Sequence, residues 1–168
     1  MSGLISSYSR DAADLAFREL MVTLRDEKER QKLSFSQMHE AAGSSHDAMF
    51  NWVHLRRQPH LDRLCDAFSS VGMELWIVPR RGCPFPMEPL RIDPESERFW
   101  RFLRFEFLPG AFDACGLAAY QAGTKAGIGR NTVYSWLGGY VRPMARSLFR
   151  VLNLAGYTIE ARESRTGG

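Results

Sequence analysis

The 168-residue sequence predicts a mainly α-helical protein made of two similar units, each of which ends in a short β-strand. Most of the chain has apolar residues spaced three and four apart, which is the pattern of amphipathic helices. Two apolar runs, at 74–78 and 157–161, are instead short and rich in strand-forming residues. Residues 33–72 also align with 117–156 without a gap, so we expect the two units to be copies of one plan.

The composition limits the class of protein. Hydrophobic residues make up 45% of the chain, which is enough for a core and excludes a long disordered protein. No run approaches the roughly 18 uninterrupted apolar residues of a membrane-spanning helix, and the first residues lack the order of a secretion signal. The three cysteines have no C-x-x-C spacing, and their odd number suits a reducing compartment. We therefore expect a cytoplasmic protein that does not enter a membrane.

The formal net charge of +3 is unevenly distributed. Residues 1–98 carry 13 Lys and Arg against 15 Asp and Glu, a balance of −2, whereas residues 99–168 carry 9 against 4, a balance of +5. A basic half is the electrostatic footprint expected of contact with phosphates. The C-terminal half is therefore the better candidate for binding nucleic acid.

The first unit is predicted to span residues 1–79. Serine can cap a helix start, glycine accommodates the left-handed turn at a helix end, and proline stops a helix. On these signals the helices run from Ser9 or Asp11 to about Lys32, from Ser34 to Gly43, from Ser45 to Pro59, and from His60 to Gly72. The strand at 74–78 completes the unit.

A linker and a second unit follow. Residues 80–93 contain three prolines and a glycine and are predicted to be extended. The second unit, 94–168, opens at Asp93-Pro94-Glu95, which is a strong helix start. Aromatic residues nearly encircle the helix at 97–108, so we expect it to pack between the two halves or in a dimer contact. The remaining elements are predicted as helices at 117–126, 130–137 and 145–156, a strand at 157–161, and a disordered tail at 163–168.

The repeat has an offset of 84 residues. Its eight identities in about 45 positions fall on turn glycines, a helix-stopping proline and core positions. The identical pairs are Leu33/Leu117, Gln37/Gln121, Ala42/Ala126, Gly43/Gly127, Trp52/Trp136, Pro59/Pro143, Leu64/Leu148 and Gly72/Gly156. Each copy thus has the order short helix, glycine turn, helix containing a tryptophan, proline, helix, glycine and strand.

This plan resembles the lambda-repressor and Cro-like helix-turn-helix family. The resemblance rests on residues 33–59 and 117–143, and the run 127–139 is the part most similar to the family pattern. It implies two lambda-repressor-like domains in one chain, each of which places the helix after the glycine turn in the major groove of duplex DNA. It also implies that the N-terminus of the preceding helix lies on a phosphate.

The resemblance assigns base-reading roles in the second copy. Arg130 would pair with guanine and Asn131 with adenine. Gly129 would occupy the helix-cap position and leave backbone N–H groups for phosphate. The candidate DNA-binding residues of this copy are Arg130, Asn131, Thr132, Ser135, Lys125, Tyr140 and Arg142.

The first copy differs at its base-facing positions. Asp47 departs from the family pattern, because a carboxylate in the groove repels phosphate unless it accepts a hydrogen bond from cytosine. The second copy is therefore expected to be the stronger reader of sequence. The equivalent positions of the first copy are His46, Asp47, Ala48 and Asn51, and its candidates for backbone contact are His54, Arg56, Arg57, His60 and Arg63.

These features predict a transcriptional regulator that binds double-stranded DNA sequence-specifically through tandem helix-turn-helix units. The two strands are available for pairing, within the chain or in a homodimer. The alternative is a protein-interaction adaptor, in which the N-terminal unit binds a partner of the transcription machinery and only the C-terminal unit contacts DNA. An enzyme is disfavoured because the sequence has no G-x-S-x-G, Walker or H-E-x-x-H motif. The histidines and cysteines lack metal-ligand spacing, so no metal or cofactor is expected.

Overall fold

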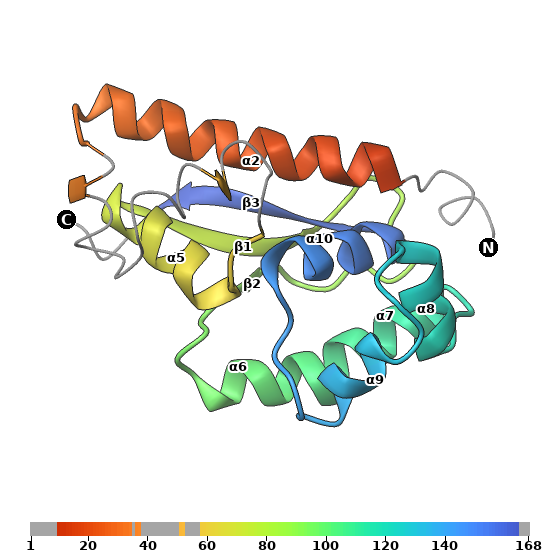
Figure 1. Cartoon of the computed structure of the whole chain (residues 1–168). Helices are drawn as coiled ribbons and strands as arrows, with labels where there is room; N and C mark the ends of the chain where they lie inside the picture. Colours follow the sequence, from red (N-terminus) through yellow and green to blue (C-terminus); the bar gives the residue numbers. More distant parts are fainter. Residues whose placement is uncertain (1–9, 35, 38–50, 53–57, 165–168) are drawn as a thin grey trace.

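The computed structural model describes residues 10–34, 36–37, 51–52 and 58–164. This part of the chain is mainly helical, with a three-stranded antiparallel sheet in the order β2-β1-β3. The elements in chain order are α2 (Arg10–Arg30), α5 (Leu61–Ser70), β1 (Met73–Pro79), β2 (Leu90–Arg91), α6 (Glu97–Phe102), the π-helical η1 (Leu103–Phe107), α7 (Leu108–Ala114), α8 (Ala119–Ala126), α9 (Thr132–Leu137), α10 (Ala145–Leu154) and β3 (Tyr157–Glu163). Figure 1 shows α2 along one side of the sheet, and the continuous helical segment α6-η1-α7 across the molecule from it.

Helix α2 forms where the apolar spacing predicts it. Its buried residues recur every three or four positions and pack against α10 and β3. They are Ala13, Phe17, Leu20, Met21 and Leu24.

The residues after α2 confirm the predicted cap at Ser34. The hydroxyl oxygen of Ser34 accepts a hydrogen bond from the backbone N–H of Gln37, and the side-chain oxygen of Gln37 accepts one from the backbone N–H of Ser34. In the second repeat the side-chain oxygen of Gln121 accepts from the backbone N–H of Ala118. The identity Gln37/Gln121 therefore reflects a shared helix cap.

The predicted linker packs at its C-terminal end. Leu90 and Arg91 pair with Ile77 and Trp76 to add β2 to the edge of β1, and Ile92 is buried. Apolar residues on either side of Arg91 give this segment the alternation of a half-buried strand, which the prolines before it concealed. The sheet therefore has one more strand than the sequence predicts.

The aromatic helix begins three residues later than Pro94, the first helical residue predicted. Ser96 caps it, with a hydroxyl oxygen that accepts a hydrogen bond from the backbone N–H of Phe99, while the indole N–H of Trp100 donates to the carbonyl of Pro94. Pro109 has no N–H to offer the carbonyl four residues earlier, and the helix widens into η1 just before it.

A pseudo-two-fold axis relates α5 and β1 of the first repeat to α10 and β3 of the second. Helices α5 and α10 begin and end 84 positions apart, and so do strands β1 and β3. These strands pair antiparallel, and their central pair, Trp76 and Glu160, joins two equivalent residues. His60 and Met144, also 84 positions apart, form an isolated antiparallel bridge. Because equivalent residues that pair antiparallel are exchanged by a two-fold rotation, the axis passes through both pairs.

Backbone hydrogen bonds at the ends of the strands obey the same symmetry. The N–H of Ser164 donates to the carbonyl of Gly72 at 2.9 Å, and the N–H of Arg80 donates to the carbonyl of Gly156 at 2.8 Å. Ser164 is equivalent to Arg80 and Gly72 to Gly156, so the two-fold rotation converts one bond into the other. Of the two possibilities left by the sequence, the strands therefore pair within the chain.

One hydrophobic core extends across both repeats. It contains equivalent residues from each, including Trp52 with Trp136 and Leu64 with Leu148. The segments 1–79 and 94–168, predicted as separate domains, thus share a sheet and a core in the described part of the chain.

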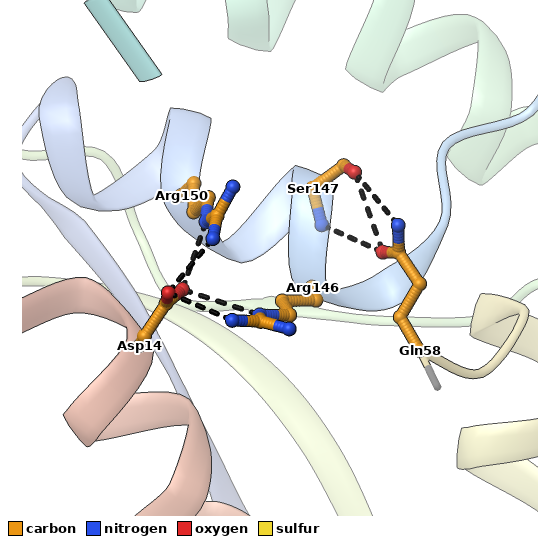
Figure 2. Close-up of polar contacts among 5 residues, drawn as sticks. All are labelled: Asp14, Gln58, Arg146, Ser147 and Arg150. Atoms are coloured by element: carbon orange, nitrogen blue, oxygen red, sulfur yellow. Dashed lines mark hydrogen bonds and ion pairs between the residues drawn. The ribbon is translucent and has the colours of Figure 1, made fainter. Parts of the chain in front are cut away.

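Polar contacts also join the two halves (Figure 2). The carboxylate of Asp14 on α2 accepts hydrogen bonds from Arg146 and Arg150 on α10. The side-chain oxygen of Gln58 accepts from the backbone N–H and the hydroxyl of Ser147.

Candidate nucleic-acid interface

Helix α8, a glycine-containing turn and helix α9 form the candidate helix-turn-helix of the second repeat. Gly127 ends α8 in the left-handed conformation, with φ 74°. A methyl group at Gly123 would collide with the carbonyl oxygen of Gly129, so a glycine in α8 is what lets the turn approach. Ala126, Val133 and Trp136 are buried at the contact between the two helices. Glycines and small residues thus fix the angle between α8 and α9.

The start of α9 differs from the prediction. The helix begins at Thr132 with Asn131 at the cap position, and Gly129, predicted at the cap, lies in the turn with φ 102°. Gly129 lies three residues before the first residue of α9, and its positive φ, which glycine adopts without strain, reverses the chain in the turn. The hydroxyls of Thr132 and Ser135 donate to the carbonyls of Ile128 and Asn131, at 2.7 and 3.2 Å.

The exposed surface of this motif carries basic and aromatic side chains. Arg130, Asn131 and Lys125 are exposed, as predicted for DNA-contacting residues. The guanidinium of Arg130 lies 5.6 Å from the centre of the Tyr120 ring, so the ring supports the cation at the surface.

Tyr134 is a surface residue that sequence reasoning missed. It is 49% exposed and lies three residues after Asn131, which places it on the face of α9 opposite the buried Val133 and Trp136. Helical spacing from Asn131 is the sequence signal that could have identified this exposed position.

Tyr140 and Arg142 lie in the loop after α9 and differ in their surroundings. Tyr140 is 86% exposed. Arg142 is held against α6, where it forms an ion pair with Glu97 at 2.9 Å and lies 4.7 Å from the centre of the Trp100 ring. Arg142 thus fastens the loop to the aromatic helix.

Two further arginines reach the motif from distant parts of the sequence. The side chain of Arg10 lies against the turn at Gly127, and that of Arg104 lies against Gly139 and donates to the carbonyl of Leu137 at 3.3 Å. No local sequence pattern identifies these residues, because both contacts depend on the tertiary fold. They add two positive charges beside α8 and α9.

The first repeat is described only in part. Asn51 is helical and half-buried, and Trp52 is buried like its equivalent Trp136. Six of its predicted positions lie outside the described residues: His46, Asp47, Ala48, His54, Arg56 and Arg57.

Comparisons with protein-family models, curated proteins and solved structures give no match to this chain. None of the described helices has the length and apolar character needed to cross a bilayer. In the same residues, no group of three or more His, Cys, Asp or Glu side chains is placed to hold a metal ion.

Proposed function

We propose that this protein is a sequence-specific regulator of transcription that binds double-stranded DNA, with α9 in the major groove. The observation that carries the proposal is the pair α8 and α9, joined through a glycine turn, with Arg130, Asn131 and Tyr134 on the outer face of α9 or just before it. Arginine and asparagine are the side chains that bind guanine and adenine edges in two-point contacts. Lys125 and Arg10 near the turn supply charge for phosphates.

The pseudo-two-fold axis supports the same proposal. Dimeric helix-turn-helix proteins use two-fold symmetry to present two reading helices to two half-sites. A single chain with the same symmetry can present two different readers, because Arg130 and Asn131 correspond to His46 and Asp47 in the other repeat. The proposed target is therefore a site with two dissimilar half-sites.

Binding measurements as a function of salt test this proposal. The purified protein is titrated onto a pool of random duplexes, a bound sequence is selected, and its affinity is compared between wild type and Arg130→Ala with Asn131→Ala. We expect the double variant to bind the selected sequence at least tenfold more weakly, since each two-point base contact contributes about 1–3 kcal/mol. Arg18→Ala, an exposed arginine on α2, is the matched control and should bind like wild type. Equal affinity of wild type and the double variant would refute the assignment of α9 as the reader.

The second candidate is an adaptor, whose first repeat binds a protein partner while its second contacts DNA. Charge favours it, because α5 carries Asp62 and Asp66 where α10 carries Arg146 and Arg150. A negative surface repels DNA and attracts basic protein segments.

A further inference from the structure

Helix α10 shows how this repeat binds a helix. Helix α2 contacts Arg146 and Arg150 of α10 through Asp14 (Figure 2). It contacts Phe149, one turn after Arg146, through Phe17. The Asp14 carboxylate is 2.8 Å from Arg146 and 2.7 Å from Arg150, and the rings of Phe17 and Phe149 meet edge to face at 5.6 Å. A carboxylate followed one turn later by a large apolar side chain is thus the recognition element of α2.

The equivalent face of α5 lines an open groove. Moving back 84 positions from Arg146, Phe149, Arg150 and Asn153 gives Asp62, Cys65, Asp66 and Ser69. All four of these residues line one groove of about 680 Å³, together with parts of β1 and the start of α6. The groove therefore occupies the place on α5 that α2 occupies on α10, with its charge reversed and a small thiol in place of a phenyl ring.

The segment α6-η1-α7 is the counterpart of α2 but does not fill this place. Trp100 and Leu103 align with Phe17 and Leu20 when the repeat offset is 83 residues instead of 84. The π-helical turn η1 contains one extra residue, so the residues after it align at an offset of 84 again. Unlike α2 on α10, α6 is not closely packed on α5 in the described structure.

The charges of the groove disfavour close packing of α6 on α5. At the same offset Glu97 stands for Asp14, so the groove brings together the carboxylates of Glu97, Asp62 and Asp66. Glu97 is turned to Arg142 instead. Six carboxylates and two guanidinium groups, those of Arg91 and Arg142, line the groove, so its net charge is negative. Burial, with repulsion from Asp62 and Glu95, raises the pKa of Asp66.

We propose that the groove between α5 and α6 docks a helix of a partner protein, one that carries Lys or Arg where α2 has Asp14 and a large apolar residue where α2 has Phe17. The basic side chain would lie between Asp62 and Asp66, and the apolar one would fill the space left by Cys65. Phosphates are repelled by this surface, and the α2 helix of a second copy has the wrong charge. This proposal rests on the adaptor function and names the surface that would bind the partner. Its test contains no DNA, so the docking groove can be refuted whether or not α9 binds DNA.

The probe is a 21-residue peptide with the sequence Arg10–Arg30 and the change Asp14→Arg, and the matched peptide keeps Asp14. Each is titrated onto the full chain and followed by fluorescence anisotropy and by amide chemical shifts. We expect the Asp14→Arg peptide to bind at least tenfold more tightly, to weaken with salt, and to shift the amides of Asp62, Cys65, Asp66 and Ser69. Asp62→Asn with Asp66→Asn should weaken its binding at least tenfold, whereas Asp113→Asn, an exposed acid on α7, should not.

Equal affinity for the two peptides, absence of binding at millimolar peptide, or shifts confined to α8 and α9 would each overturn the proposal. Cys65→Phe keeps every charge and fills the groove with the side chain found at Phe149, so it should abolish binding even if the Asn variant fails to fold. Peptide binding that survives Cys65→Phe would place the peptide elsewhere and refute the groove.

Discussion

Asp14 is the carboxylate that joins α2 to α10, and its environment gives it a pH-dependent role. Burial alone raises the pKa of Asp14, but the hydrogen bonds from Arg150 and Arg146 outweigh this effect and hold the pKa well below its usual range. A carboxyl group whose pKa is lower in the folded state stabilises that state above its unfolded pKa of about 3.9, and the contribution is lost as the pH falls through the folded value.

We expect Asp14→Asn to lower the free energy of unfolding by about 2 kcal/mol at pH 7, because two half-buried arginines lose their partner. The difference from wild type should shrink as the pH falls below about 4, because Asp14 then binds a proton in the unfolded chain while the folded chain keeps it ionised. Urea unfolding at a series of pH values measures both effects. Asp26→Asn, at an exposed pair with Arg25, is the control and should change stability by less than about 0.5 kcal/mol. A difference that persists undiminished at pH 2 would contradict this account.

Lys32 and Gly116 are equivalent residues that share a left-handed backbone, with φ 56° and 67°. A methyl group at Gly116 would meet no atom within 4 Å, so only the backbone conformation opposes a side chain there. We expect Gly116→Ala to destabilise the protein by about 1 kcal/mol, because a side chain is strained in the left-handed conformation. Lys32→Gly should stabilise it by a few tenths of a kcal/mol, because relief of that strain slightly exceeds the cost of a more flexible unfolded chain. Thermal unfolding of both variants measures this, and stabilisation by Gly116→Ala would contradict it.

Single residues were predictable where their role is local. The caps at Ser34 and the left-handed Gly127 follow from sequence, because their partners lie within a few positions. Arg10 and Arg104 could not be found in this way, because only the folded chain brings them to the turns at Gly127 and Gly139.

Helices and strands with a clear period were predicted close to their observed bounds. Strand β1 extends one residue beyond each end of the predicted 74–78, and α10 begins at the predicted residue 145. Strand β2 and the π-helical η1 were not predicted. Strand β2 forms only because the edge of β1 is available for pairing. The π-helical turn depends on Pro109, which interrupts the hydrogen bonds of a helix that is packed against the core.

The pairing of β1 with β3 predicts that the two repeats unfold together. Ile77 and Ile159 are directly paired and buried, so Ile77→Ala should cost about 3 kcal/mol. Because the strand belongs to a shared sheet, amide hydrogen exchange should accelerate equally in α5 and α10. Glu163→Gln, at the exposed end of β3, is the control and should change neither the stability nor the exchange rates. Faster exchange in α5 alone would show that the repeats unfold independently.

The repeat symmetry was visible in the sequence as an offset, but its geometry was not. An ungapped alignment shows that two segments share a plan, and says nothing of how they are placed. The axis became evident from the pairs Trp76 with Glu160 and His60 with Met144, which join equivalent residues across the molecule. The prediction of two separate lambda-repressor-like domains becomes a proposal about two readers joined by one sheet and one core.

If the shared sheet and core present two readers as proposed, one chain should occupy one DNA site. Selection from random duplexes should yield two dissimilar half-sites with centres about one helical turn apart, and light scattering of the complex should give one chain per duplex. Scrambling the half-site read by α9 should weaken binding more than scrambling the other, because Arg130 and Asn131 are better base readers than His46 and Asp47. Arg130→Ala should remove that inequality, which ties the stronger half-site to α9. A palindromic site bound by two chains would contradict the pseudo-dimer, since the axis that relates the half-sites would then lie between chains rather than through Trp76 and Glu160.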